Sequence, residues 1–197
     1  MTAYLFWHRP YEDVAQEAYE QALIAFHRDF AGRACDGFQG SATYRITETP
    51  WLGKKPGYED WTFVESSAAL DPLNKAAVAP AMWDVHAAIA GKTQLGHGGL
   101  YQQVLLGETD PATLIRTALT RTAWLERPRG IRYEVPLEAI AYQARELTGG
   151  PVSVWRKQLV LGPAPEFALL GNASLTLDLP EGWRASYVDR VPLYPAT

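Results

Sequence analysis

Two short stretches of the chain resemble each other and carry polar residues suited to proton chemistry. "YLFWHRP" (4–10) and "TAWLERP" (122–128) each place aromatic and apolar residues before an Arg-Pro pair, with His8 in the first where Glu126 stands in the second. An imidazole exchanges protons near neutral pH, and a nearby carboxylate orients it and favours its charged form. His8 and Glu126 are therefore candidate catalytic residues. The alternative is that both are surface residues at strand ends.

The similarity continues into the segments that follow. Aligning Arg9 with Arg127 also brings Phe6 onto Trp124 and Gly32 onto Gly150 without a gap. We interpret the two halves of the chain as a divergent internal duplication. Between these points, the alignment pairs four positions spaced as on one face of a helix: Tyr19 with Leu137, Ala22 with Ile140, Leu23 with Ala141 and Phe26 with Ala144.

Hydrophobic periodicity predicts the order β-α-β-β-α-β in the first half, with strands at 2–8, 36–46, 58–66 and 98–108 and a helix at 12–30. Pro72 and Pro80 interrupt the second helical segment, which predicts two helices or a kinked one. The second half repeats a strand (119–126), a helix (136–148) and a strand (152–161), but 167–180 and 183–193 both read as strands. The second helix is therefore lost there. The predicted units are 1–108, a linker at 109–117, and 118–197.

Side chains alternate between the two faces of a strand, and this predicts which residues face a ligand. Ala3, Leu5 and Trp7 are uniformly apolar and suit packing against helices. Their neighbours, which include His8, would then point into the space between the two sheets. The candidate substrate-binding residues in this interior are Tyr4, Phe6, Trp124, Arg45 and Gln103. Aromatic walls with a few polar groups suit a flat, mostly apolar compound.

The remaining histidines and the cysteine are weaker candidates. His86 lies on the second helical segment, and Asp84, two residues earlier, falls on a different face. His97 lies between glycines, where a ligand could approach the backbone, although a plain turn explains it as well. His27 follows the pattern of a cation near a helix end. No pair of histidines has a metal-ligand spacing and Cys35 stands alone, so no metal site is predicted.

Composition excludes several classes of function. The 197 residues are 47% hydrophobic and 20% charged, which predicts a folded chain with a sizeable core. The net charge of −4 is small and no stretch is rich in Lys or Arg, so neither nucleic acid nor a membrane is a predicted partner. The single cysteine and the absence of a signal-peptide pattern predict a cytoplasmic protein. No phosphate loop or G-x-S-x-G elbow occurs, which disfavours nucleotide binding and serine hydrolysis.

The tandem β-α-β-β-α-β order resembles the dimeric α/β-barrel superfamily. The stretch "YEDWTFVESSAALDPLNKAAV" (58–78), with "GGLY" (98–101) after it, is also similar to segments of uncharacterised bacterial proteins. The resemblance implies an α+β fold of two fused ferredoxin-like repeats, the second degenerate, whose antiparallel sheets face each other within one chain. Superfamily members include antibiotic-biosynthesis monooxygenases, haem-degrading enzymes, chlorite-dismutase-like haem proteins and muconolactone isomerases.

The resemblance also bears on cofactors. In haem-degrading relatives a helix histidine ligates the iron, so His86 is the implied ligand if haem binds. Those relatives also use an Asn on the first strand, and no Asn occurs there in this chain. We therefore predict no cofactor, with haem as the alternative.

Together these observations predict a small-molecule-binding protein. If it is an enzyme, it is of oxygenase or isomerase type and acts on a small apolar or aromatic compound in the barrel interior. His8 or His86 would then be the acting residue and Glu126 would support it. The alternative is a non-catalytic module that binds a ligand or forms homo-oligomers through its sheet edges. The sequence does not decide between the two.

Overall fold

The computed structural model describes residues 1–33, 35–104, 119–159 and 161–194. Eight strands lie in these ranges: β1 (Thr2–Pro10), β2 (Phe38–Thr49), β3 (Lys55–Val64), β4 (Thr93–Gln103), β5 (Arg121–Glu126), β6 (Ser153–Lys157), β7 (Phe167–Gly171) and β8 (Arg184–Tyr194). The α-helices described are α1 (Gln16–Ala31), α2 (Leu70–Ala77), α3 (Trp83–Ala90) and α5 (Glu134–Thr148). The predicted linker at 109–117 lies outside the described residues.

The strands form one closed antiparallel barrel in the order β1-β3-β2-β8-β5-β7-β6-β4. Pairing of β2 with β8 and of β4 with β6 joins the two halves of the chain. Within each half the four strands lie in the same order, β4-β1-β3-β2 in the first and β8-β5-β7-β6 in the second. The fold is therefore α+β with a closed barrel, and the common origin of its halves stays a prediction.

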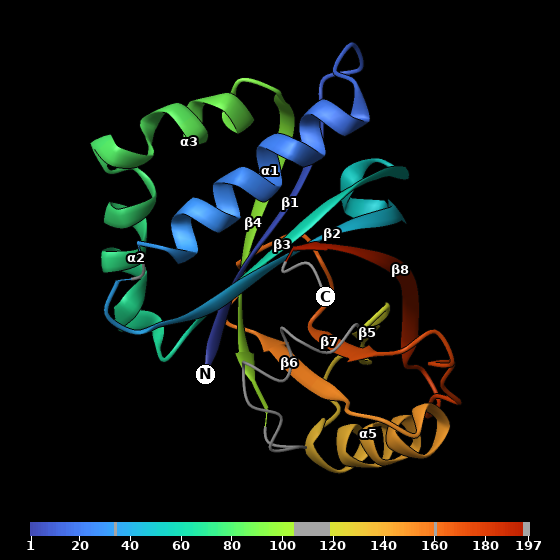
Figure 1. The fold of residues 1–197 in the computed structure, drawn as a ribbon. Coiled ribbons are helices and arrows are strands. Elements are labelled where there is room, and N and C mark those ends of the chain that lie inside the picture. Colours follow the sequence, from blue (N-terminus) through green and yellow to red (C-terminus); the bar gives the residue numbers. More distant parts are fainter. Residues whose placement is uncertain (34, 105–118, 160, 195–197) are drawn as a thin grey trace.

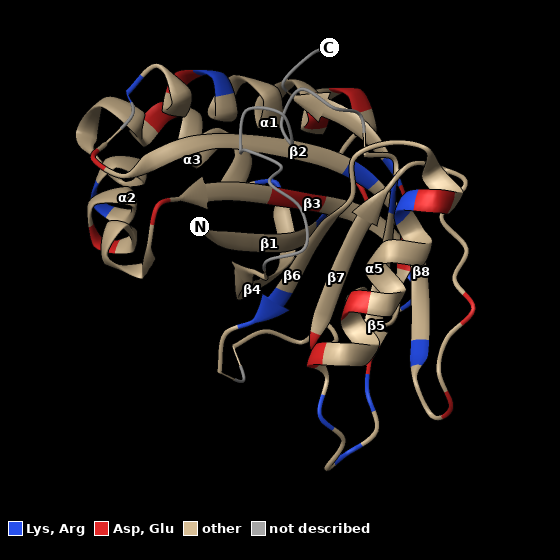
Figure 2. Ribbon diagram, turned by 90° about the horizontal axis from the view of Figure 1, so that it is seen from below, with Lys and Arg blue, Asp and Glu red and all other residues tan. Residues whose placement is uncertain are grey.

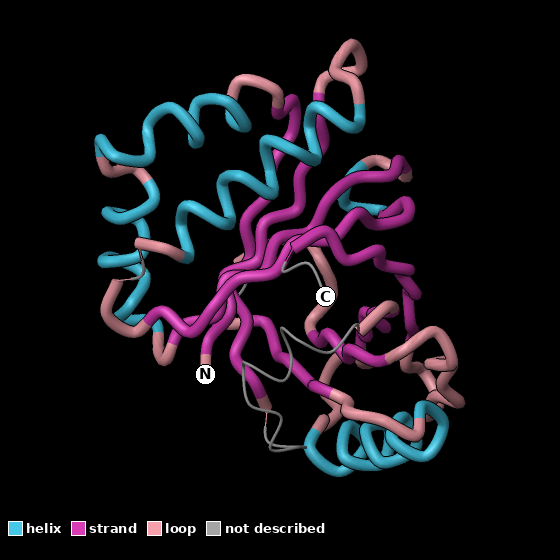
Figure 3. The backbone as a smooth tube through the Cα atoms, in the orientation of Figure 1, coloured by secondary structure: helices cyan, strands magenta, loops and turns pink. Residues whose placement is uncertain are grey.

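Helices cover the barrel from outside. The first half carries α1, α2 and α3, while α5 lies against the second half (Figures 1 and 3). Pro80 begins a short 3-10 turn that separates α2 from α3, which confirms the interruption predicted there. Pro72 lies in the first turn of α2, where a missing amide costs no helical hydrogen bond, and does not interrupt it. No helix in the described ranges is long and apolar enough to span a membrane. Acidic and basic residues are interspersed over the helices and strand ends (Figure 2).

Each long helix buries one stripe of side chains. On α1 the stripe is Tyr19, Leu23, His27 and Phe30, and on α5 it is Leu137, Ile140, Ala141 and Ala144. These positions recur at helical spacing, so burial of the stripe accounts for the helical conformation. One of them, His27, is polar, and it faces the sheet rather than water.

The strand predicted at 167–180 is too long. β7 ends at Gly171, where the Asn172 side chain accepts a hydrogen bond from the Ser174 backbone and donates one to the Thr148 carbonyl. Such a turn competes with strand pairing. The alternating leucines beyond it pack as an irregular segment on the apolar cluster around α5 instead.

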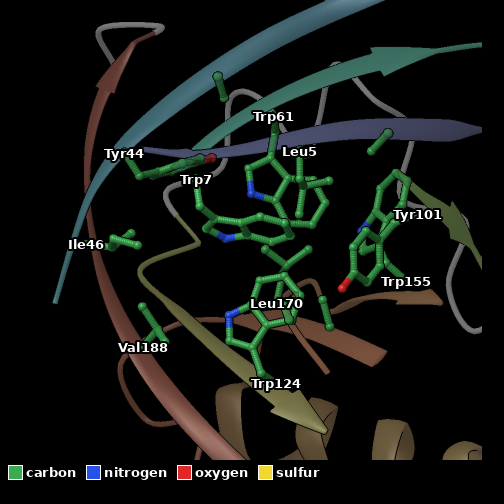
Figure 4. Packing of buried hydrophobic residues seen from close by; sticks show 14 of the residues in the cluster. Leu5, Trp7, Tyr44, Ile46, Trp61, Tyr101, Trp124, Trp155, Leu170 and Val188 are labelled. Atoms are coloured by element: carbon green, nitrogen blue, oxygen red, sulfur yellow. The ribbon is translucent and has the colours of Figure 1, made fainter. Parts of the chain in front are cut away.

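The barrel interior is filled by large side chains. Trp7, Trp61, Trp124 and Trp155 are buried there to at least 99% and pack edge to face (Figure 4). An eight-stranded barrel is just wide enough to be filled by side chains, and four indoles are enough to fill it. The predicted ligand cavity inside the barrel is therefore wrong.

The predicted orientation of the β1 side chains is also wrong, because the two faces of the strand are exchanged. Ala3, Leu5 and Trp7 point into the barrel, and the alternate residues Phe6 and His8 point outward toward the helices. Alternation along a strand separates two faces but does not say which one is inside. The uniformly apolar set lies in the closed interior, where all three side chains are fully buried, and the set with polar groups lies on the outer face.

Candidate functional site

A pocket of about 790 Å³ lies between the outer face of the first sheet and the three helices that cover it. The sheet floor comes from β1, β3 and β4, and the walls from α1, α2 and α3. Most wall residues are apolar, among them Leu23, Phe26, Phe30, Leu73, Val78 and Ile89. One long helix and two of eight residues do not cover this sheet surface as tightly as side chains fill the barrel, so a hollow remains.

Glycines on β4 give the floor its shape. Gly96 and Gly98 pair with β1, and a Cβ atom on Gly96 would lie 2.3 Å from Cζ of Phe6. A Cβ on Gly98 would lie 2.9 Å from the Tyr4 hydroxyl. The aromatic side chains of β1 therefore lie across β4 in space that only glycine leaves free.

Gly96→Ala tests this packing. We expect the added methyl group to displace the Phe6 ring and to lower the free energy of unfolding by about 1–3 kcal/mol, the usual cost of overpacking. Gly32→Ala is the control, because a Cβ there meets its neighbours at ordinary distances of 3.6 and 3.7 Å. Chemical denaturation of both variants measures the difference, and equal stabilities would contradict the role given to Gly96.

Asp60 on β3 is the polar centre of the pocket floor. Its Oδ2 lies 3.1 Å from Nε2 of His8 on β1, and its Oδ1 lies 3.4 Å from Nε2 of His27 on α1. Both imidazoles are at least 98% buried, and the Asp60 side chain is 12% exposed. The Asp60 carboxylate thus contacts two histidines, one on a strand and one on a helix.

Electrostatics keep this carboxylate ionised. Burial by itself would raise the pKa of the Asp60 carboxyl, but the imidazoles of His8 and His27 outweigh it and hold the pKa well below its usual range. Asp60 is therefore a hydrogen-bond acceptor with a permanent negative charge at neutral pH. Its low pKa makes it a weak base.

Hydroxyl groups satisfy the other ring nitrogens. Nδ1 of His8 lies 2.6 Å from the Tyr19 hydroxyl, which lies 2.8 Å from Oγ1 of Thr93. Nδ1 of His27 lies 3.0 Å from Oγ of Ser41. These partners fix both ring orientations, as second-layer groups do in sites that move protons.

Two buried polar atoms at this site lack a hydrogen bond within the described part of the chain. They are Nε2 of His27 and Oδ1 of Asp60, which face each other at a distance that allows ion pairing but without hydrogen-bond geometry. Buried polar atoms are nearly always hydrogen-bonded in folded proteins. Neither atom has exposed surface, so their ion pair with each other is the contact that compensates their burial.

The structure brings together four of the eight residues predicted from the sequence. His8, Tyr4, Phe6 and His86 all line the pocket, with the His86 ring 5.9 Å from that of Phe26. Tyr4, Phe6 and His8 do so on the outside of the barrel, where the sequence predicted the inside, and His86 does so from α3, in the helical segment where it was predicted.

The other four lie elsewhere. Glu126 is exposed, pairs with Arg184 at 2.9 Å and borders a different hollow, so His8 and Glu126 do not share this pocket. Trp124 is in the barrel core. Arg45 pairs with Glu20 at 3.0 Å. Gln103 lies at the end of β4, where its side chain reaches Ser153, and is not among the residues that line this pocket.

Sequence reasoning missed Asp60, Tyr19 and Thr93 and undervalued His27. One signal was available for His27, because it falls on the buried stripe of an amphipathic helix where an apolar residue is the norm. Asp60 carries no such signal. It adjoins Glu59, and only the tertiary structure shows that Glu59 faces the barrel core while Asp60 faces the pocket.

The described pocket lining contains no set of metal ligands and no Lys or Arg for the propionates of haem. Within the described ranges no three His, Cys, Asp or Glu residues are placed to hold a metal. His86 could reach a ligand in the pocket, but no Lys or Arg is among the described residues that line it, and the one carboxylate is Asp60. The propionates of haem would therefore have only neutral donors such as Asn74 and Gln94 to bind, without a Lys or Arg among the described lining residues to compensate their charge.

Comparison with known proteins supports the fold. No protein-family model matches the chain, and no curated protein matches it significantly. The structure of an anthrone oxidase-like protein matches with a TM-score of 0.54 and 11% sequence identity, over 96% of this chain and 91% of that one. The likeness shows a shared fold. It agrees with the α+β barrel architecture observed here.

Two further solved structures match at lower scores. A putative chlorite dismutase has a TM-score of 0.49 and 9% identity, over 98% of this chain and 95% of that chain. A mutant chlorite dismutase from Candidatus Nitrospira defluvii, in complex with cyanide, has a TM-score of 0.49 and 7% identity, over 98% and 91%.

Proposed function

We propose that the pocket binds a neutral, mostly apolar small molecule and exchanges a proton with it. The observation that carries this proposal is the Asp60 carboxylate held between two buried imidazoles at the floor of an apolar pocket. Perturbed titratable groups in a concave site are typical of catalytic centres.

The lining defines the ligand class. A volume near 790 Å³ is in the range of small-molecule sites and accommodates a two- or three-ring compound. Asp60 is the only Asp, Glu, Lys or Arg among the described lining residues. It would repel an anionic ligand, whereas a neutral compound with a hydroxyl or carbonyl group could form hydrogen bonds with the uncharged polar lining residues Thr93, Asn74 and Gln94.

The groups at the floor have separate parts in this chemistry. His8 is the proton acceptor, because Asp60 remains ionised and is too weak a base. Asp60 orients His8 and stabilises its imidazolium form. His27 lies on the other side of Asp60, where its Nε2 is 3.4 Å from Oδ1 and adds to the stabilisation of the carboxylate charge.

The reaction class is therefore proton abstraction from a hydroxyl or an acidic carbon, the first step of an isomerisation or of a cofactor-independent oxidation. Because the fold is shared with an anthrone oxidase-like protein, anthrone is a suitable probe. Anthrone is neutral and tricyclic. Loss of a proton from its methylene carbon moves the electron pair to the carbonyl oxygen, and protonation there gives the phenol tautomer.

Thermal denaturation with anthrone and 2-naphthol, against the anion 2-naphthoate, tests the ligand class. A ligand that binds only the native state at about 100 times its Kd stabilises by about 2.7 kcal/mol, or roughly 5–10 °C in Tm for a chain of this size. We expect this for the neutral compounds alone. Stabilisation by the anion alone would contradict the proposal.

Deuterium exchange at the methylene carbon of anthrone, followed by NMR in D₂O under nitrogen, tests the chemistry. We expect the protein to accelerate exchange above the buffer rate, and oxygen uptake in air to show whether oxidation follows. Binding without accelerated exchange would favour the non-catalytic module. Asp71→Asn serves as the control, because Asp71 is exposed, pairs with Lys75 and is not among the described lining residues, so its loss should leave exchange intact.

A further inference from the structure

His8 has no nitrogen free to touch a ligand. Its Nε2 faces Asp60 at 3.1 Å and its Nδ1 faces the Tyr19 hydroxyl at 2.6 Å. Its ring is stacked between Phe6 and Tyr58, with ring centroids 5.2 and 5.6 Å away, and 1% of the residue is exposed. A base in this position cannot receive a proton from the pocket directly.

A path leads from Nδ1 of His8 to the pocket surface. The Tyr19 hydroxyl lies 2.8 Å from Oγ1 of Thr93, and Thr93 lines the pocket while Tyr19 is fully buried. Oγ1 of Thr93 also lies 3.0 Å from the Ile89 carbonyl, near the end of α3. Three exchangeable groups from β1, α1 and β4 are thus within hydrogen-bond distance in series.

We propose that the Tyr19 and Thr93 hydroxyls relay protons between a ligand in the pocket and His8. The proposal rests on the function proposed above and adds two residues to it, a positioning and relay group (Tyr19) and the group that contacts the ligand (Thr93).

The chain has two complete hydrogen-bond arrangements with the same atomic positions. With neutral His8, Thr93 donates to Tyr19, Tyr19 donates to Nδ1, and Nε2 donates to Asp60. When the ligand gives its proton to Oγ1 of Thr93, the Thr93 proton passes to Tyr19 and the Tyr19 proton passes to Nδ1. His8 is then an imidazolium that donates to Tyr19 and Asp60, and Thr93 donates to the Ile89 carbonyl. No proton is lost, and every donor has an acceptor in both arrangements.

The surroundings suit a relay through neutral hydroxyls. Burial raises the pKa of Tyr19, so that its hydroxyl keeps its proton and passes protons by exchange. The titratable and charged groups that face His8 are Asp60 and Tyr58 on β3 and Tyr19 on α1, with His27 on the far side of Asp60. Tyr58 itself is turned toward Glu20, to which its hydroxyl donates at 3.2 Å.

Two variants of Thr93 distinguish a role of its hydroxyl in proton relay from a purely structural role of the side chain. Thr93→Val keeps the shape and loses the hydroxyl, whereas Thr93→Ser keeps the hydroxyl. We expect Thr93→Val to lower the anthrone exchange rate about 10- to 100-fold with little change in the Kd for anthrone, and Thr93→Ser to restore most of the rate. Equal losses in both variants, or a loss explained by weaker binding, would overturn the relay.

An NMR measurement without ligand tests the relay even if the protein does not accelerate deuterium exchange of anthrone. In labelled protein, protonation of the His8 ring should shift the ¹³C signal of the Ile89 carbonyl at the same pH, because Thr93 then turns its proton toward that carbonyl. We expect the Ile89 carbonyl signal to follow His8 protonation in the parent protein and in Thr93→Ser, but not in Thr93→Val or Tyr19→Phe. If the Ile89 carbonyl signal follows His8 protonation but anthrone exchange is not accelerated, the proposed function is overturned and the relay stands. If the signal still follows His8 protonation in Tyr19→Phe, the relay is overturned.

Discussion

Arg190→Met is expected to lower the free energy of unfolding by about 3–5 kcal/mol, which is the usual cost of leaving one partner of a buried ion pair alone. Arg190 on β8 is 3% exposed, and its Nε lies 3.4 Å from Oε1 of Glu59 on β3, which is fully buried. Removing the guanidinium leaves a carboxylate in the barrel core without a counter-charge.

The surroundings make this pair hard to replace. Glu59 accepts hydrogen bonds from the indole nitrogens of Trp7 at 2.8 Å and Trp61 at 2.6 Å. The Arg190 guanidinium lies 3.6 Å from the centre of the Tyr44 ring. The pair therefore ties the strands of both halves together and orients two of the core tryptophans.

Arg184→Met is the matched control, because Arg184 also lies on β8 and pairs with a glutamate, Glu126, but both of these side chains are more than half exposed. Exposed pairs contribute about 0–1 kcal/mol. Urea denaturation compares the variants at constant pH. The double variant Arg190→Met with Glu59→Gln should be more stable than Arg190→Met alone, since the unpaired charge is gone and an acceptor for one indole remains. A cost below about 1 kcal/mol for Arg190→Met would show that the pair is not essential.

Asp60→Asn is expected to have the second large effect, on both proton exchange and acid stability. Without the carboxylate charge, His8 loses the group that stabilises its imidazolium, and we expect exchange with anthrone to fall about 10²- to 10⁴-fold, the usual contribution of positioned acid–base groups. The ligand Kd should change less than the rate, because the apolar walls remain.

The acid stability follows from the lowered pKa of Asp60. The folded protein holds the pKa of this carboxyl below its ordinary value of 3.8, so the unfolded chain takes up the proton first as the pH falls. The stabilisation is complete above that ordinary value and is lost as the pH falls through it toward the folded value. Asp60→Asn should therefore be less stable than the parent at pH 6, and the difference should shrink below about pH 4.

Asp71→Asn provides the comparison for both measurements. Asp71 is 73% exposed and pairs with Lys75 one helical turn away, so its loss should change neither exchange nor the acid profile measurably. Denaturation curves at several pH values measure the difference. If Asp60→Asn keeps the parent's pH dependence, the histidines do not stabilise the charged carboxylate in the way described.

Much of the architecture could be predicted from the sequence because it depends on local signals. A proline in a helix interior removes a backbone hydrogen bond and clashes one turn back, so Pro80 predicts an interruption, and the alternation along 2–8 predicts a strand. The loss of the second helix from the second half was also readable, since too few residues separate Gly171 from Trp183 for a helix and its connections. The leucines after Gly171 misled the strand prediction, because apolar alternation also suits an irregular segment packed on α5.

The candidate site was only partly predictable, for a physical reason. His8, His86, Tyr4 and Phe6 were identified by residue type, but His8 was paired with Glu126, at the equivalent position of the second stretch. Asp60 lies beside His8 because β1 and β3 are neighbouring strands in the sheet. This pairing joins residues that are far apart in the sequence. Register of this kind has no local signature.

The amino-acid sequence alone determined that this chain is an α+β protein whose two halves use similar strand and helix segments, because backbone propensity and periodicity act over a few residues. Only the tertiary structure decided which face of each strand is inside. Closing the barrel required its interior to be filled with tryptophan, and the helices cover the opposite face incompletely. The pocket, and the meeting of Asp60 with two histidines inside it, follow from that difference in packing.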